Sequence, residues 1–215
     1  MSQPRIDDVL RVLDPAPGFR PWHGGASPAG SLRGVSEVVA AWRPAPGRSS
    51  IWELALHIAY WKYAVRRRLV GGPSGAFPRS PSNWPEVPQP ADAKAWKADR
   101  ALLRDEHAQV VAAIRGFDPA RYDEVAPGGT SSGAGSGSGA GTTFGDLIMG
   151  VVMHDTYHTG QIQLLKRHLR EAVAPGTPAA LGSTMADGGA PPSVEMVLGR
   201  ERFEALVEEL FHMQI

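Results

Sequence analysis

The chain has 215 residues, enough for one domain of ordinary size with a buried core and too few for two full domains. Lys and Arg number 22, as do Asp and Glu, so the formal net charge is zero and gives no electrostatic footprint for nucleic acid. Cysteine is absent, which excludes disulfides, thiolate zinc sites and cysteine nucleophiles and leaves nitrogen and oxygen as the only metal ligands.

The N-terminal segment favours a cytoplasmic protein. Its residues, MSQPRIDDVLRVLD, are acidic and amphipathic and lack the apolar stretch of a signal peptide. No segment reaches about 18 uninterrupted apolar residues, so we also expect no membrane span.

The first half of the chain predicts three helices. A short helix is expected from about Ile6 to Leu13, and after a Gly- and Pro-rich loop a second from about Ala29 to Trp42. The third predicted helix, from Ile51 onward, has the clearest signals. Ser50 and Glu53 form an S-x-x-E capping box before an apolar run, and the glycines at 71 and 72 provide its end.

A proline-rich segment and another helix follow. Residues 71–90 carry too many prolines for regular structure and predict a long ordered loop, with Phe77 and Trp84 holding it to the helices. From Asp92, a suitable N-cap, to about Gly116, the next helix is expected to bury a face with a nearly heptad spacing: Trp96, Leu103, Val110 and Ile114.

Each of the last two predicted helices follows a segment that is rich in small residues. Residues 127–141 are almost only Gly, Ser and Ala and predict a mobile connection. Thr143 and Asp146 are expected to open a helix that runs to about Arg170. After a linker at 171–193, residues 194–215 predict an amphipathic helix with one apolar stripe: Phe203, Leu206, Val207, Leu210 and Phe211.

No segment shows sustained strand alternation, so the predicted fold class is all-α. Four principal helices would form a four-helix bundle, which makes residues 1–170 the bundle domain. The C-terminal helix is an addition that would pack on the bundle or on a partner subunit.

Two histidines near the C-terminal third point to a metal. In FGDLIMGVVMHDTYHTGQIQLLKRH, His154 and His158 are four residues apart and therefore lie on one face of a helix. The natural third ligand is His57, in SSIWELALHIAYW. Three imidazoles suit zinc or nickel first, with iron, manganese and copper as alternatives, and do not suit calcium or magnesium.

The spacing alone leaves a second interpretation open. A histidine on an apolar helical face is more often a core residue with a hydrogen-bond partner than a ligand. The H-x-x-x-H pair also lacks the glutamate directly after its first histidine that marks the H-E-x-x-H protease motif.

The blocks WHGG, PGRSSIWELALHIAYWKYAVRRRL, SNWPEVPQP with the tryptophan of AWKAD, and FGDLIMGVVMHDTYHTGQIQLLKR resemble the DinB/YfiT-like family of four-helix-bundle metalloenzymes. The resemblance covers roughly Pro21 to Leu169. It implies that one histidine of an early helix and two of the last bundle helix bind a divalent metal, which corresponds to His57, His154 and His158.

Three further residues are candidates for catalysis. Gln161 follows His158 by three positions and shares its face, so it could bind a water or the substrate, or be an ordinary interhelical amide. Glu53 precedes His57 by one turn and could reach the metal or an imidazole N–H beyond its capping role. His23 lies in a glycine-containing loop and is our candidate for the mouth of a cleft.

Three protein ligands leave coordination positions open, as catalytic sites do, which favours a metal-dependent hydrolase acting on a small molecule. The family resemblance implies an alternative, transfer or isomerisation with a low-molecular-weight thiol. A third hypothesis is that the protein is a non-catalytic binding module of a stress response. The family resemblance and the apolar helix faces also lead us to expect a homodimer.

Overall fold

The computed structural model describes residues 3–19, 26–71, 75–127 and 141–173. Within them six α-helices follow one another: α1 (Gln3–Leu13), α2 (Pro28–Ser31), α3 (Glu37–Ala41), α4 (Ile51–Val70), α5 (Ala93–Arg115) and α6 (Phe144–Val173). A single 3-10 turn occupies Pro119–Arg121. These residues form no strand, only an isolated bridge between Val125 and Thr143. The predicted all-α class is confirmed.

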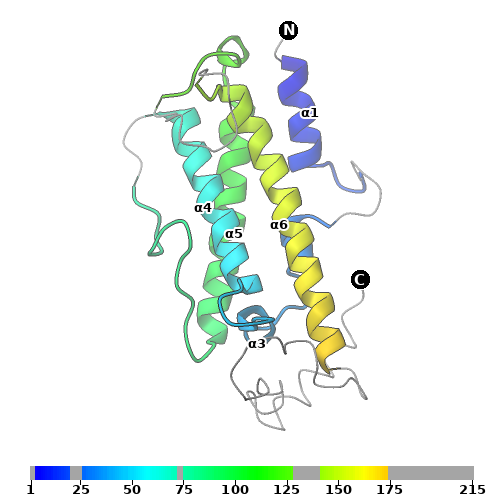
Figure 1. Cartoon of the computed structure of the whole chain (residues 1–215). Coiled ribbons are helices and arrows are strands. Elements are labelled where there is room, and N and C mark those ends of the chain that lie inside the picture. Colours follow the sequence, from blue (N-terminus) through cyan, green and yellow to red (C-terminus); the bar gives the residue numbers. More distant parts are fainter. Residues whose placement is uncertain (1–2, 20–25, 72–74, 128–140, 174–215) are drawn as a thin grey trace.

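The long helices lie side by side (Figure 1). Helix α4 packs against α5 and α6, and α1 packs against α5 and α6 from the other side. Figure 1 also shows that α4 and α5 run in the same direction, because the loop between them returns along the length of the helices, whereas α6 runs opposite to both. The short helices α2 and α3 lie at the end where α4 begins and α6 ends.

The three longest helices begin where the sequence predicted. Ser50 and Glu53 form the capping box of α4, and Gly71, at φ 70°, ends it. The Asp92 side chain accepts from the Ala95 N–H at the start of α5. At the start of α6, Thr143 Oγ1 accepts from the Asp146 N–H while the Asp146 carboxylate accepts from the Thr143 N–H.

The prediction of one helix from about Ala29 to Trp42 is wrong. The chain forms two short helices there, with the N-caps Ser27 and Ser36. Gly34 between them has a φ of 69°, a left-handed conformation that a continuous helix cannot contain. The side chain of Ser36 accepts from the Val39 N–H, so it starts a new helix instead of continuing the old one.

Two apolar clusters form the core, one toward each end of the long helices. The first joins Leu32 and Val35, which follow α2, and helix α3 to the first half of α4 and the second half of α6. The second joins α1 to the last turns of α4 and α5 and to the first half of α6. The predicted buried face of α5 is confirmed, since Trp96 and Leu103 belong to the first cluster and Val110 and Ile114 to the second.

Some sequence predictions lie outside the described residues. They concern His23, most of the Gly- and Ser-rich connection, the linker at 171–193 apart from its first three residues, and the helix at 194–215. Among the helices that are described, none combines the length and apolarity needed to cross a membrane.

Gly145 allows the start of α6 to lie close to Tyr122, at the end of the 3-10 turn. A Cβ at this position would lie 2.3 Å from Cε1 of the buried Tyr122 ring. We predict that Gly145→Ala lowers the free energy of unfolding by about 1–3 kcal/mol, because the ring and helix must move apart. Urea unfolding at pH 7 measures this value.

The matched control is Gly160→Ala on the same helix, where an added Cβ meets nothing within 4 Å. Here alanine should stabilise the protein by up to about 1 kcal/mol through its higher helix propensity. Equal effects of the two substitutions would contradict the close approach at Gly145.

Candidate metal centre

His57 lies in the middle of α4, with its ring held from the loop that follows this helix. The residue is buried, with 6 % of its surface exposed. Its Nδ1 is 2.8 Å from the backbone oxygen of Asn83, and the Trp84 ring stacks on it at 3.9 Å between centroids. Because a carbonyl oxygen only accepts hydrogen bonds, Nδ1 carries the proton and Nε2 carries a lone pair.

His158 on α6 is oriented in the same way by a neighbour on its own helix. Its Nδ1 lies 2.6 Å from Oε1 of Gln161. The Gln161 amide nitrogen in turn donates to the Tyr157 hydroxyl, 3.2 Å away, which sets the direction of the amide. With its oxygen facing the ring, Gln161 accepts from Nδ1–H and leaves Nε2 of His158 free to bind a cation.

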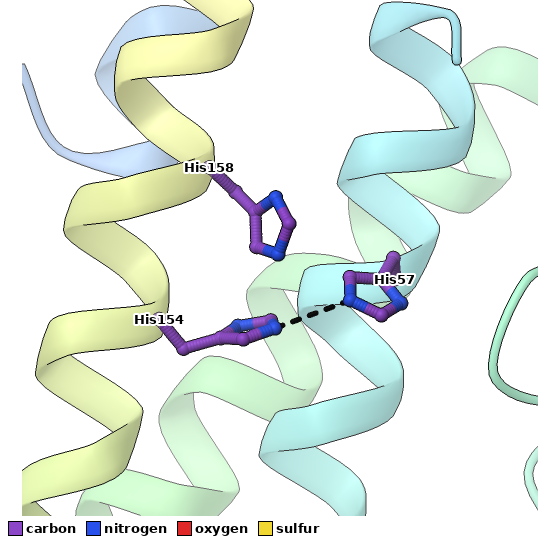
Figure 2. Close-up of side chains that lie close together, drawn as sticks. All are labelled: His57, His154 and His158. Atoms are coloured by element: carbon purple, nitrogen blue, oxygen red, sulfur yellow. Dashed lines mark hydrogen bonds between the residues drawn. The ribbon is translucent and has the colours of Figure 1, made fainter. Parts of the chain in front are cut away.

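His154 completes the cluster one turn before His158 (Figure 2). Its Nε2 lies 3.2 Å from Nε2 of His57, across the interface between α4 and α6. One ligand atom from each of the three histidines lies within 4.8 Å of the others. Two nitrogens bound tetrahedrally to one zinc at about 2.0–2.1 Å are about 3.3 Å apart, so the first pair already has the separation of two ligands.

The surroundings keep these imidazoles neutral. Burial, followed by the charges that His158, His57 and Lys62 carry when protonated, lowers the pKa of His154 to about 3. Burial also lowers the pKa of His57 and of His158, although the hydrogen bonds to Asn83 and Gln161 oppose it. Neutral imidazoles at pH 7 are the form that binds a metal, so cation and protons compete little.

A buried ion pair joins the same two helices beside the cluster. Lys62 of α4 donates to the carboxylate of Asp155 on α6, and its side chain is 1 % exposed. Burial lowers the pKa of Lys62, and the charge of Asp155 opposes this shift. Removing either partner would leave an unpaired buried charge, at a cost of about 3–5 kcal/mol.

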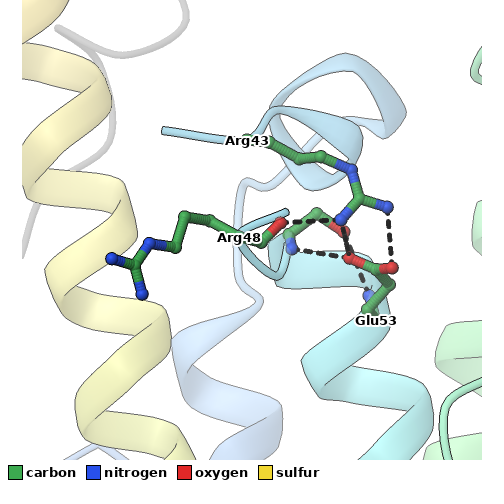
Figure 3. Close-up of polar contacts among 4 residues, drawn as sticks. Arg43, Arg48 and Glu53 are labelled. Atoms are coloured by element: carbon green, nitrogen blue, oxygen red, sulfur yellow. Dashed lines mark hydrogen bonds and ion pairs between the residues drawn. The ribbon is translucent and has the colours of Figure 1, made fainter. Parts of the chain in front are cut away.

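Glu53 lies at the start of α4 and is engaged there (Figure 3). Its carboxylate accepts from the Ser50 N–H at 2.8 Å and from the Arg43 guanidinium at 2.6 Å. Arg43 also donates to the backbone oxygen of Arg48. Among the described residues, the group that could hold a metal consists of the three histidines and does not include Glu53.

Sequence reasoning named Gln161 as a site residue, and the structure places it as the acceptor for His158, but the Asn83 carbonyl and the flanking ion pair were missed. Lys62 and Asp155 could have been found, because each shares the helical phase of buried apolar neighbours such as Ile58 and Val151. The role of Asn83 has no sequence signal, since every residue has a backbone carbonyl oxygen.

Comparison with known proteins identifies the family. A model of the DinB superfamily matches residues 29–162, more than half of the chain, and this range includes all three histidines. Comparisons with curated proteins and with solved structures found no match.

We predict that the protein, purified without a metal-binding tag, binds one divalent transition metal per chain. His57→Ala and His158→Ala should each weaken zinc binding by more than about a hundredfold, because two ligands cannot hold the ion tightly. Isothermal titration with Zn²⁺ and elemental analysis measure this. His168→Ala, an exposed histidine of α6, should bind like the wild type. Wild-type affinity in both cluster variants would contradict the site.

We further predict that Gln161→Ala weakens zinc binding by about 10–100-fold, because His158 loses the acceptor that holds its tautomer. Gln161→Glu keeps an acceptor at this position and should retain most of the affinity. Gln163→Ala on the same helix is the matched control. Should Gln161→Ala and Gln163→Ala bind zinc equally well, the orienting role of Gln161 would be refuted.

Proposed function

The chain belongs to the DinB superfamily, and from this membership together with its three-histidine cluster we propose that it is a metal-dependent hydrolase acting on a small molecule. We further propose that its long helices form the four-helix bundle expected from the sequence. The cluster would then lie inside this bundle, where side chains of facing helices build metal sites.

One observation carries the proposal. The Nε2 atoms of His57 and His154 face each other at 3.2 Å, and a ring nitrogen of His158 lies within 4.8 Å of ring nitrogens of both. Three nitrogen donors leave coordination positions for a water or a substrate. When bound there, a divalent cation would act as a Lewis acid that polarises a carbonyl group and lowers the pKa of water toward about 7.

The residues around the cluster would orient the imidazole rings and keep water away from part of the site. Asn83 and Gln161 hold the Nδ1 protons of His57 and His158, so that both rings present Nε2. The Trp84 ring covers one face of His57, and Trp61 lies 5.9 Å from the His154 ring. These two aromatic rings would exclude water from the part of the site that they cover, and the substrate would enter from a side that they leave open.

The donor set also limits the metal. Three neutral imidazoles match zinc or nickel, and iron, manganese or copper would fit the same nitrogens with other geometries. The cluster contains no carboxylate that would favour calcium or magnesium.

The function is tested with zinc- and nickel-loaded protein on a panel of small esters and amides, beginning with p-nitrophenyl acetate. We predict hydrolysis without added thiol, and its loss after chelation of the metal and in His57→Ala. His168→Ala should keep wild-type turnover. If no ester or amide is hydrolysed faster than in buffer alone, the hydrolase proposal is contradicted.

The same protein is then given 1-chloro-2,4-dinitrobenzene with and without a low-molecular-weight thiol. Turnover that requires the thiol would replace hydrolysis by the thiol-transfer alternative at the same cluster. Failure of both reactions in a protein that binds no metal would leave the non-catalytic binding module.

A further inference from the structure

A pocket lies between α4 and α6 next to the three-histidine cluster. Its volume is about 220 Å³, and it opens to the surface. Its walls are mostly carbon: Trp61 and Val65 of α4 face Leu147, Gly150 and Val151 of α6, and His154 is also part of the lining. For comparison, a dry protein cavity of roughly 150 Å³ lined by Leu, Ile and Phe accommodates benzene. The pocket is therefore large enough for one aromatic ring.

The pocket adjoins the candidate metal centre. His154 belongs both to the pocket wall and to the group of three histidines. Trp61, the other shared neighbour, lies 5.9 Å from the His154 ring and 6.4 Å from the His57 ring. A small molecule that extends from the pocket past His154 would therefore contact both the pocket and the cluster.

The charged side chains of the pocket make hydrogen bonds within the protein. Lys62 and Asp155 contribute to its lining but bind each other, and both are buried. Asp146 caps the start of α6 by accepting from the backbone N–H and hydroxyl of Thr143. Oδ1 of Asp155 has no hydrogen-bond partner but is itself buried. The carbon walls therefore offer most of the contact surface, and they favour an apolar ligand.

We propose that this pocket binds an apolar group of the substrate, of the size of a phenyl ring or a short branched alkyl chain, while the reacting polar end lies at the three histidines. The inference rests on the proposed function for the position of the reacting end. It restricts the substrate class to small molecules with one such apolar substituent next to the group that is attacked.

Gly150 provides the test, because a Cβ added to it meets nothing within 4 Å. Gly150→Leu should fill the pocket without straining the helix. The matched control is Gly160→Leu on the same helix, where an added Cβ also meets nothing within 4 Å but the residue is not part of the pocket lining.

The probes are acetohydroxamate and benzohydroxamate, two chelators that differ in a methyl and a phenyl group, titrated into zinc-loaded protein by calorimetry. In the wild type and in Gly160→Leu, benzohydroxamate should bind at least about tenfold more tightly, because its ring leaves water. In Gly150→Leu this preference should fall to about twofold or less, with the affinity for acetohydroxamate unchanged. A preference below twofold in the wild type, or an undiminished one in Gly150→Leu, would overturn the inference.

A second measurement does not need the metal. Titration of the metal-free protein with benzene, followed by ¹⁵N–¹H spectra, should shift the amide signals of residues 150 and 151 in the wild type, and the signals of the same two positions should not shift in Gly150→Leu. Unshifted signals in the wild type would overturn the inference. A protein that passes both binding tests but hydrolyses no ester or amide retains the apolar pocket and loses the proposed function, so the two failures are distinguishable.

Discussion

The candidate centre depends on the register between two antiparallel helices, α4 and α6. His57 and His154 are separated by 97 positions in the chain, yet their Nε2 atoms lie 3.2 Å apart. The ion pair between Lys62 and Asp155 joins the same helices beside them. A slide of one helix by a single turn would move these groups by about 5.4 Å and leave two buried charges without partners. The ion pair therefore opposes the displacement that would also separate the imidazoles.

The polar groups lie between two apolar clusters, and this position explains their electrostatics. The clusters bury the helix interfaces toward either end of the long helices, where burial of carbon stabilises the fold. Between them, desolvation lowers the pKa values of the histidines and of Lys62. For the imidazoles this shift produces the neutral, metal-binding form. For Lys62 the paired carboxylate offsets part of the desolvation.

The loop between α4 and α5 links fold and site. Phe77 belongs to the first apolar cluster and packs against Tyr60 and Tyr63, which holds the loop along α4. Farther along the loop, Asn83 and Trp84 contact the His57 ring. Side-chain burial at one point of the loop thus positions a backbone oxygen and an aromatic ring at another. His154, in turn, connects the cluster to the carbon-lined pocket between α4 and α6.

The sequence by itself determined the local features: the all-α class, the capped starts of α4, α5 and α6, the buried face of α5 and the i, i+4 placement of His154 and His158. These follow from helix periodicity and from side chains that bond within three or four residues. It predicted a continuous helix where Gly34 and Ser36 divide the chain, because apolar spacing does not reveal a left-handed residue. The family resemblance named His57 as the third member of the cluster, and the tertiary structure brings its ring to the pair. Only the tertiary structure decided that Glu53 is held by Arg43 and that the Asn83 carbonyl orients a ring. Such contacts depend on how distant segments pack and on backbone atoms that every residue shares.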